Sequence, residues 1–299
     1  MTINHPTISQ NGVVRPTNVE IDLDRLTQNY EAIAGSVSPA KVMVILKANA
    51  YGHGMVPVAH HLVSIGADYL GVAVLEEGIL LRESGIKAPI LILGGIIGNQ
   101  VPLFLDHDLT LTASSTEKLQ QINEAAKARG VTAREHLKVD TGMERIGVHY
   151  YNADSLLEAS LTCSHIEVEG IYSHFANSDA LDLDSARIQL QRFEQVLSFY
   201  EDRDLPYPPL RHMANSGAIL QLPESHFDMV RPGILLYGVY PSAEAERSIA
   251  IQPAMSWKSR VVYFKVVKPD HPVSYGSTWQ SDRLTRVVTV PVGYGDGYF

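Results

Sequence analysis

Lys41-Val-Met-Val-Ile-Leu-Lys47-Ala-Asn-Ala-Tyr51-Gly-His-Gly54 is an apolar run that ends on a lysine and leads into two glycines. Residues 42–46 are unbroken and rich in β-branched side chains, which is typical of a strand covered on both faces. Strands of this kind belong to parallel sheets flanked by helices. The segment therefore predicts an α/β fold.

Lys47 lies at the carboxyl end of this predicted strand. In α/β sheets and barrels the loops at that end converge on one cleft, where the chemistry is done. A lysine that emerges from an apolar strand is partly desolvated, which frees its amine to attack a carbonyl and form an imine. The alternative is a lysine that extends to water, and the strand by itself favours this alternative.

The composition is that of an ordinary globular protein, with 45% hydrophobic and 19% charged residues among 299. The net charge of −9 and the lack of basic clusters argue against nucleic acid or an anionic membrane as a partner. We therefore expect a small-molecule substrate. The single cysteine, Cys163, excludes an internal disulfide and a cysteine-based metal site, and no His-Glu-x-x-His zinc pattern occurs, so we expect no metal.

The N-terminal residues contain no apolar segment of a signal peptide, and no stretch reaches the roughly 18 apolar residues of a membrane span. We therefore expect a cytoplasmic protein. Residues 1–16 are polar and are predicted to form a flexible tail.

From residue 17 onward, short apolar runs alternate with longer amphipathic segments, a pattern typical of repeated βα units. The predicted strands are 18–21, 42–47, 69–74, 89–93, 110–113, 136–139, 168–174, 210–214 and 229–236. The predicted helices are 24–33, 56–65, 76–83, 115–128 and 185–200, with Ser115 as a helix start. This pattern favours a (β/α)8 barrel of the TIM type over an open doubly wound sheet, which stays the alternative.

The pattern changes after residue 249. Segments 255–267 and 286–292 are rich in β-formers, and no helix-length segment separates them. We therefore predict an α/β barrel over residues 17–249 and a partial all-β C-terminal domain over residues 250–299. The chain stops where another turn would lead onward, so we expect this domain to be truncated.

Several other predicted strand ends carry side chains that can do chemistry. Lys138-Val-Asp-Thr-Gly-Met-Glu-Arg145 follows one strand, and Ser173-His174-Phe-Ala ends another. His212-Met-Ala-Asn215-Ser216-Gly offers polar side chains and amides that suit a phosphate, and Arg231-Pro-Gly233-Ile234 adds an arginine before a tight turn. Each motif has an ordinary structural explanation by itself, but all of them lie at one predicted edge.

These motifs, together with Ser274-Tyr275-Gly-Ser-Thr, resemble those of alanine racemases and occur in the order typical of that family. The resemblance extends from about Arg15 to the last residue. It implies a barrel followed by a β domain, pyridoxal 5′-phosphate as cofactor, and interconversion of L- and D-alanine for peptidoglycan precursors. With this resemblance, Lys47 is expected to form the imine rather than to extend to water.

The resemblance also implies two proton-transfer groups. Lys47 would hold the cofactor and act as the base on one face of the α-carbon, and Tyr275 would serve the opposite face. Racemisation needs both groups, because a single base tends to return the proton to the side from which it came. In the family this tyrosine comes from a partner subunit, so a homodimer with shared active sites is implied.

Further roles follow from the same resemblance. Arg231 would face the pyridine nitrogen, and His174 would bind Arg231 and help to link it to Tyr275. Arg145 would contact the cofactor and the substrate carboxylate. Lys138 corresponds to a lysine that is often carbamylated in the family.

The remaining site residues concern the phosphate and the substrate entrance. Tyr51, Ser216, Gly233 and Ile234 are expected to bind the phosphate, and Asn215 is expected to bind the cofactor or to support that loop. Tyr294 resembles a residue that narrows the substrate entrance and so belongs to the substrate-binding set.

Two alternatives stay open at this point. The first is a truncated barrel that binds pyridoxal phosphate and is catalytically inactive, because later family segments near the substrate and the phosphate are missing. The second is a racemase for serine or for a broad range of amino acids on the same fold, since the missing segment helps to set substrate size.

Overall fold

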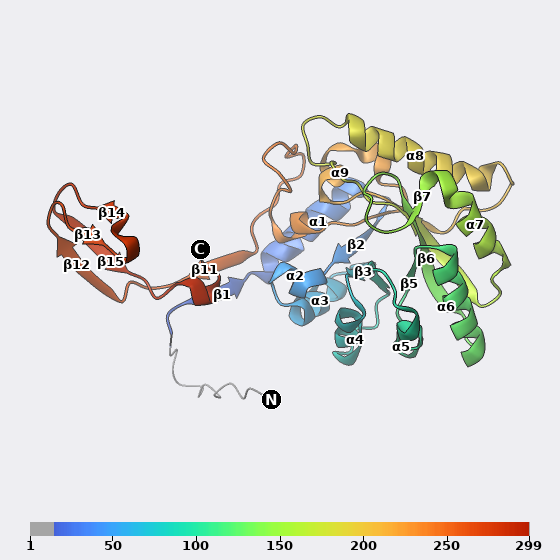
Figure 1. Ribbon diagram of the computed structural model, residues 1–299, viewed down its shortest axis with the longest axis horizontal. Helices are drawn as coiled ribbons and strands as arrows, with labels where there is room; N and C mark the ends of the chain where they lie inside the picture. The colour runs from blue at the N-terminus through green and yellow to red at the C-terminus, as the bar shows by residue number, and fades with distance from the viewer. Residues whose placement is uncertain (1–14, 299) are drawn as a thin grey trace. The chain divides into compact units, whose positions relative to one another are not determined.

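The computed structural model describes residues 15–298, so the predicted flexible tail, 1–16, lies almost entirely outside the described residues. The chain divides into two compact units (Figure 1). The larger unit comprises residues 23–254. The smaller unit combines the described residues up to Asp22 with those from Met255 onward. The domain boundaries expected at residues 17 and 249 stay a prediction.

Parallel strands form the centre of the larger unit. They are β2 (Lys41–Ile45), β3 (Tyr69–Val72), β4 (Ile90–Ile92), β5 (Leu111–Ala113), β6 (Ala133–Asp140), β8 (Ile166–Tyr172), β9 (Leu210–His212) and β10 (Met229–Val230). The pairings run β10-β2-β3-β4 and β5-β6-β8-β9, while β7 (Val148–His149) pairs with β6. Ile92 N donates to Thr110 O and Arg231 N donates to Ala214 O, which joins the two runs at both edges. The sheet is therefore a closed barrel, as predicted.

Helices follow the strands and cover the outside of the barrel (Figure 1). They are α1 (Leu23–Val37), α3 (Met55–Ser64), α4 (Leu75–Glu83), α5 (Val101–Asp106), α6 (Thr116–Arg129), α7 (Ala153–Thr162), α8 (Asp184–Glu201) and α9 (Ser216–Gln221). In α1 the buried Leu26, Tyr30 and Ile33 recur at helical spacing and face the barrel. The Ser115 side chain accepts a hydrogen bond from Lys118 N at 3.2 Å, which confirms the predicted helix start.

Two predicted strands differ from the structure. Residues 18–21 do form a strand, β1 (Asn18–Ile21), but it pairs antiparallel with β11 (Met255–Lys258) and belongs to the smaller unit. The strand predicted over 229–236 ends at Val230, and residues Ile234–Tyr237 form a 3-10 helix. Pro232 and Gly233 interrupt the extended backbone between them, because proline cannot donate to a sheet and glycine favours turns.

The described part of the smaller unit contains only strands and short 3-10 helices. Strand β12 (Tyr263–Val267) pairs with β15 (Thr285–Thr289), and β13 (Pro272–Val273) pairs with β14 (Trp279–Gln280). The short helices are η5 (Tyr275–Ser277) and η6 (Tyr294–Asp296). The all-β character predicted for the C-terminal region is thus confirmed.

Alternating side chains of the barrel strands fill its interior. Met43, Ile45, Tyr69, Leu91 and Tyr172 belong to one buried cluster there. The interior is thus packed, and the free space lies at the strand ends. Within residues 15–298, no helix has the length and apolarity that crossing a membrane requires.

Candidate active site

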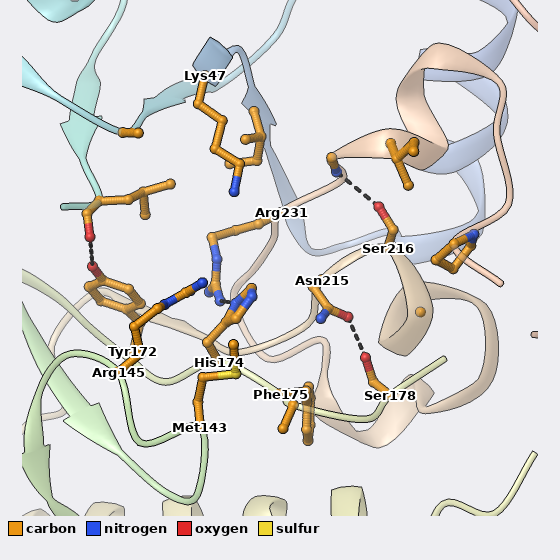
Figure 2. A pocket seen from close by; sticks show the side chains of 18 of the residues that line it. Lys47, Met143, Arg145, Tyr172, His174, Phe175, Ser178, Asn215, Ser216 and Arg231 are labelled. Carbon is orange, nitrogen blue, oxygen red and sulfur yellow. Dashed lines mark hydrogen bonds between the residues drawn. The ribbon is translucent and has the colours of Figure 1, made fainter. Parts of the chain in front are cut away.

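A cavity of about 540 Å³ opens at the carboxyl ends of the barrel strands (Figure 2). Its lining residues come from loops that follow most of the strands. They are Ile45, Lys47, Tyr51, Ala73, Leu93, Gly94, Lys138, Met143, Arg145, Ile146, Tyr172, His174, Phe175, Ala176, Ser178, Asp179, Asn215, Ser216, Gly217, Arg231, Gly233, Ile234 and Pro241. This is where a barrel places its functional side chains.

Lys47 was predicted to end a strand, but in the structure it opens a left-handed turn. Strand β2 ends at Ile45, and the segment assigned as α2 (Lys47–Tyr51) has positive φ angles of 53–54° from Ala48 to Tyr51. For residues other than glycine this conformation costs about 1–2 kcal/mol each. Such a turn persists only where its surroundings hold it, and it marks a functional segment.

Hydrogen bonds from neighbouring elements hold this turn. Ala48 N donates to Glu77 Oε1 at 2.7 Å, and Met55 N donates to Asn49 Oδ1 at 2.8 Å. Glu77 also accepts from Ala73 N at 2.8 Å, so one carboxylate fixes both the turn and the start of α4. The turn aims the Lys47 side chain into the cavity (Figure 2).

The surroundings of Lys47 favour its neutral amine. Burial lowers the pKa of Lys47, and the nearby guanidinium groups of Arg145 and Arg231 lower it further, against a smaller opposing effect of Glu77. A larger fraction of Lys47 is thus unprotonated at neutral pH than of a lysine in water. This is the form that attacks a carbonyl.

One side of the cavity is a cradle of amide and hydroxyl groups. Ser216 Oγ accepts from Gly233 N at 3.0 Å and from Leu235 N at 3.3 Å, which leaves its own proton free to donate (Figure 2). A Cβ at Gly233 would lie 2.6 Å from the Tyr51 hydroxyl oxygen, so only glycine lets the backbone approach so closely. The cradle suits an anionic oxygen group.

Asn215 supports this cradle through its side-chain oxygen. Its Oδ1 accepts from Ala218 N at 3.2 Å and from Ser178 Oγ at 2.5 Å. The side chain thereby caps α9 and connects it to the loop after β8.

Arg231 is buried and donates in several directions. Its Nη1 lies 2.6 Å from His212 Nδ1, and its Nη2 contacts Ser173 O, Met213 O and His174 Nδ1 at 2.7–3.1 Å. Burial lowers the pKa of Arg231 to about 10, so it stays charged at neutral pH. Burial and the Arg231 charge hold the pKa of His174 well below its usual value, so His174 is neutral and accepts from Arg231.

Strand β6 delivers the next two basic groups. Lys138 is buried, donates to Val139 O at 3.0 Å and lies 4.9 Å from the Tyr172 ring centre. Burial, with a further contribution from Arg231, lowers its pKa to about 7. Asp140 accepts from backbone amides that include Arg145 N at 3.1 Å, and so shapes the loop that carries Arg145 to the cavity.

The cavity brings together every site residue predicted from the barrel sequence. The remaining two, Tyr275 and Tyr294, belong to the smaller unit and have exposed side chains, 94% and 80% respectively. The sequence interpretation missed Tyr172, which reaches both Thr112 Oγ1 at 2.9 Å and the cavity. Its position at the end of β8, two residues before His174, was the signal, because both residues then lie at the same strand end.

The chain matches two family profiles in succession. "Alanine racemase, N-terminal domain" matches residues 21–241, and "Alanine racemase, C-terminal domain" matches residues 254–299. "Alanine racemase 2" of Caldanaerobacter subterraneus subsp. tengcongensis is 44% identical over 286 residues, which are 95% of this chain and 74% of the relative. The alanine racemase of Carboxydothermus hydrogenoformans is 42% identical over 96% of this chain and 77% of its own length.

Solved structures show the same similarity. The alanine racemase of Clostridium difficile 630 superposes with a TM-score of 0.88 and 35% identity, covering 96% of this chain and 76% of that one. A histidine racemase from Leuconostoc mesenteroides subsp. sake superposes with a TM-score of 0.85 and 29% identity, covering 96% and 77%.

Proposed function

The chain belongs to the alanine racemase family of pyridoxal-phosphate-dependent isomerases, and from this membership we propose that it binds pyridoxal 5′-phosphate and interconverts L- and D-alanine. One observation carries the proposal. An amine with a lowered pKa, a buried arginine and an amide-hydroxyl cradle face one cavity of about 540 Å³.

The residues present fit this cofactor. The cradle of Tyr51, Ser216, Gly233 and Ile234 suits its phosphate, because a Cβ on Gly233 would close the gap to Tyr51. Arg231 supplies a donor for the pyridine nitrogen and, as a donor that keeps its protons, leaves that nitrogen unprotonated. Asn215 contributes by holding Ser216 at the start of α9. The bound cofactor supplies a carbonyl that condenses with amines and a ring that acidifies the α-hydrogen of the substrate.

Two groups of the chain would move the proton. Lys47 serves one face of the α-carbon, where burial lowers its pKa and so raises the fraction of its amine that is unprotonated. Tyr275 serves the other face and would come from a second copy of the chain. Arg145 would bind the substrate carboxylate with its fork of donors. His174, which accepts from Arg231 Nη2 at 3.1 Å, keeps its second nitrogen for a donor bond towards the tyrosine.

A homodimer is part of the proposal. Tyr275 is almost fully exposed in the single chain, which is unusual for a catalytic side chain and suits one that completes a neighbour's site. Apolar side chains on β12, including Tyr263, Phe264 and Val266, are also exposed and offer an interface core. Tyr294, likewise exposed, would narrow the entrance of the shared site.

We expect Lys138 to carry a carbamate. Its buried amine, with a pKa of about 7, is nucleophilic at neutral pH, and two arginines nearby favour an anion. The nitrogen attacks carbon dioxide, the N–C bond forms and a proton leaves to solvent. With ¹³C-bicarbonate, one carbamate carbon should appear by NMR and grow from pH 6 to pH 8 as the amine fraction rises. The Lys138→Ala variant should not show this signal, and its kcat should be about tenfold lower than that of the wild type. Added acetate should restore part of the lost activity.

The exposed Lys127 on α6 provides the control for this experiment. Lys127→Ala should keep both the carbamate signal and the activity. A wild-type protein without any carbamate carbon at pH 8 contradicts the proposal for Lys138.

The function itself is tested by incubating the protein with pyridoxal phosphate and L-alanine in D2O. We expect the optical rotation to decay to zero and deuterium to enter the α-position, since proton removal and return both pass through solvent-exchanging groups. Bound cofactor without exchange would instead identify an inactive binding protein. Exchange without racemisation would show that only one of the two bases acts.

A different amino acid is the second candidate substrate, because a structural neighbour of this chain is a histidine racemase. The same assay with serine and histidine, compared by kcat/KM, separates the candidates. Alanine should give the highest value if the proposed function is right.

A further inference from the structure

A hydrogen-bonded series of polar side chains, buried except for the partly exposed Glu169 at its end, runs from Arg231 through the barrel interior. Arg231 Nη1 lies 2.6 Å from His212 Nδ1, and His212 Nε2 lies 2.8 Å from His136 Nδ1. His136 Nε2 lies 3.5 Å from Glu169 Oε2. Tyr69 donates to the same carboxylate oxygen at 2.7 Å. The chain thus connects a carboxylate to an arginine through two imidazoles.

The hydrogen positions along this chain follow from Arg231. Because arginine only donates, His212 Nδ1 must be the acceptor and the proton of His212 must lie on Nε2. His136 Nδ1 must then accept, and a charged His136 would set two N–H groups against each other at 2.8 Å. Both histidines are therefore neutral, and the proton of His136 lies on Nε2, facing Glu169. Burial, which lowers the pKa of both histidines, acts in the same direction.

The backbone is shaped to bring Glu169 to His136. In the β6–β8 pairing, Glu135 opposes Val168 and His136 opposes Gly170, so Glu169 is an extra residue in a bulge. Regular alternation would point residues 169 and 170 to opposite faces, and a bulge re-aims one of them. A Cβ at Gly170 would lie 2.7 Å from His136 Nδ1, so the glycine makes room for the ring.

Within residues 15–298, the hydrogen-bond partners of Arg231 are two backbone carbonyls and two imidazoles. None of them is a carboxylate. A buried charge needs oriented acceptors, and a tautomer change at His212 would replace an acceptor with a donor. His136 Nε2 has no hydrogen-bond partner within residues 15–298, and the Glu169 carboxylate oxygen 3.5 Å away is the acceptor that faces its proton.

We infer that Glu169 is a positioning residue for racemisation: its negative charge, 3.5 Å from His136 Nε2, favours the proton on that nitrogen and so fixes both imidazole tautomers that orient Arg231. The kinetic part of the inference rests on the proposed function, whereas the tautomer part does not. Glu169 touches neither the cavity nor the reacting atoms.

The first test reads the tautomers in the full-length protein. With ¹⁵N-labelled histidine, the wild type should show a protonated Nε2 and an unprotonated Nδ1 for both His136 and His212, assigned from His136→Gln and His212→Gln. Glu169→Leu should give mixed tautomers at both rings, because in part of the molecules His212 then carries its proton on Nδ1 and the contact with Arg231 is lost. Glu169→Gln should keep the wild-type signals, because its amide oxygen still accepts. If Glu169→Leu does not fold, Glu169→Met replaces it with a side chain of similar length.

The second test is kinetic. Glu169→Leu should lower kcat about tenfold in both directions, as the loss of an outer-shell partner does elsewhere, and leave KM nearly unchanged. Glu169→Gln should recover most of the activity. Glu167, exposed on the same strand, is the matched control, and Glu167→Leu should match the wild type in tautomers and rates.

Two results would overturn the inference: wild-type tautomers in Glu169→Leu, or loss of the pattern in Glu169→Gln as well. If the wild type racemises no amino acid, the proposed function fails, but the ¹⁵N signals of the variants still decide the role of Glu169.

Discussion

Lys47→Ala is expected to lower racemisation by at least about 10⁴-fold, because it removes both the covalent anchor of the cofactor and one of the two bases. The phosphate cradle and Arg231 are unchanged, so the variant should still bind pyridoxal phosphate, although without a covalent link. Borohydride reduction of the loaded wild-type protein should add the cofactor mass to the peptide containing Lys47. The variant should show no such adduct.

Lys41→Ala is the matched control for this prediction. Lys41 is exposed at the other end of the same strand, so its loss should change neither rate nor adduct. An adduct on another lysine, with wild-type turnover in Lys47→Ala, contradicts the assignment of Lys47.

Tyr275→Phe is expected to lower kcat by about 10²–10⁴-fold in both directions, since it removes the general acid-base group of one face. The two enantiomers should nevertheless respond differently in D2O. Lys47 can still exchange the α-hydrogen on its own face, so one enantiomer of alanine exchanges without inversion while the other does not exchange. Measuring α-deuterium separately in L- and D-alanine gives this result directly.

Tyr298→Phe tests whether the loss of any exposed tyrosine in the same unit has this effect. Tyr298 is also exposed, 59%, and should be replaceable without a change in rate. Equal exchange of both enantiomers by Tyr275→Phe would show that another group serves the second face.

The barrel could be predicted from sequence because its strands are apolar and its helices are amphipathic. Both signals are strong at β2 and α1. The predicted ends were less accurate, since Lys47 continues the apolar run but lies in a turn that no intrinsic preference of its residues favours. Helices α5 and α7 were missed, and α5 is only six residues long and too short to show a period. The pairing of Asn18–Ile21 with β11 joins segments far apart in the chain, which local patterns do not reveal.

The cavity residues could be predicted because the family motifs carry them. Lys47, Arg145 and Arg231 all lie in segments that follow strand ends, where their types already suggest chemistry. The series of contacts from Arg231 to Glu169 could not be predicted from the sequence. It depends on a β-bulge at Glu169 and on Gly170, which makes room for the His136 ring. Neither feature has a sequence signature outside the pairing of two strands.

The left-handed turn at residues 48–51 has a consequence for how the enzyme assembles. Since each of these residues prefers the opposite hand, the turn has no tendency to form early in an unfolded chain. It needs Glu77, which is in place only when α4 has docked on the barrel. We therefore expect Lys47 to reach its working position only after α4 has docked, so that a newly made chain must fold this part of the barrel before it can take up its cofactor.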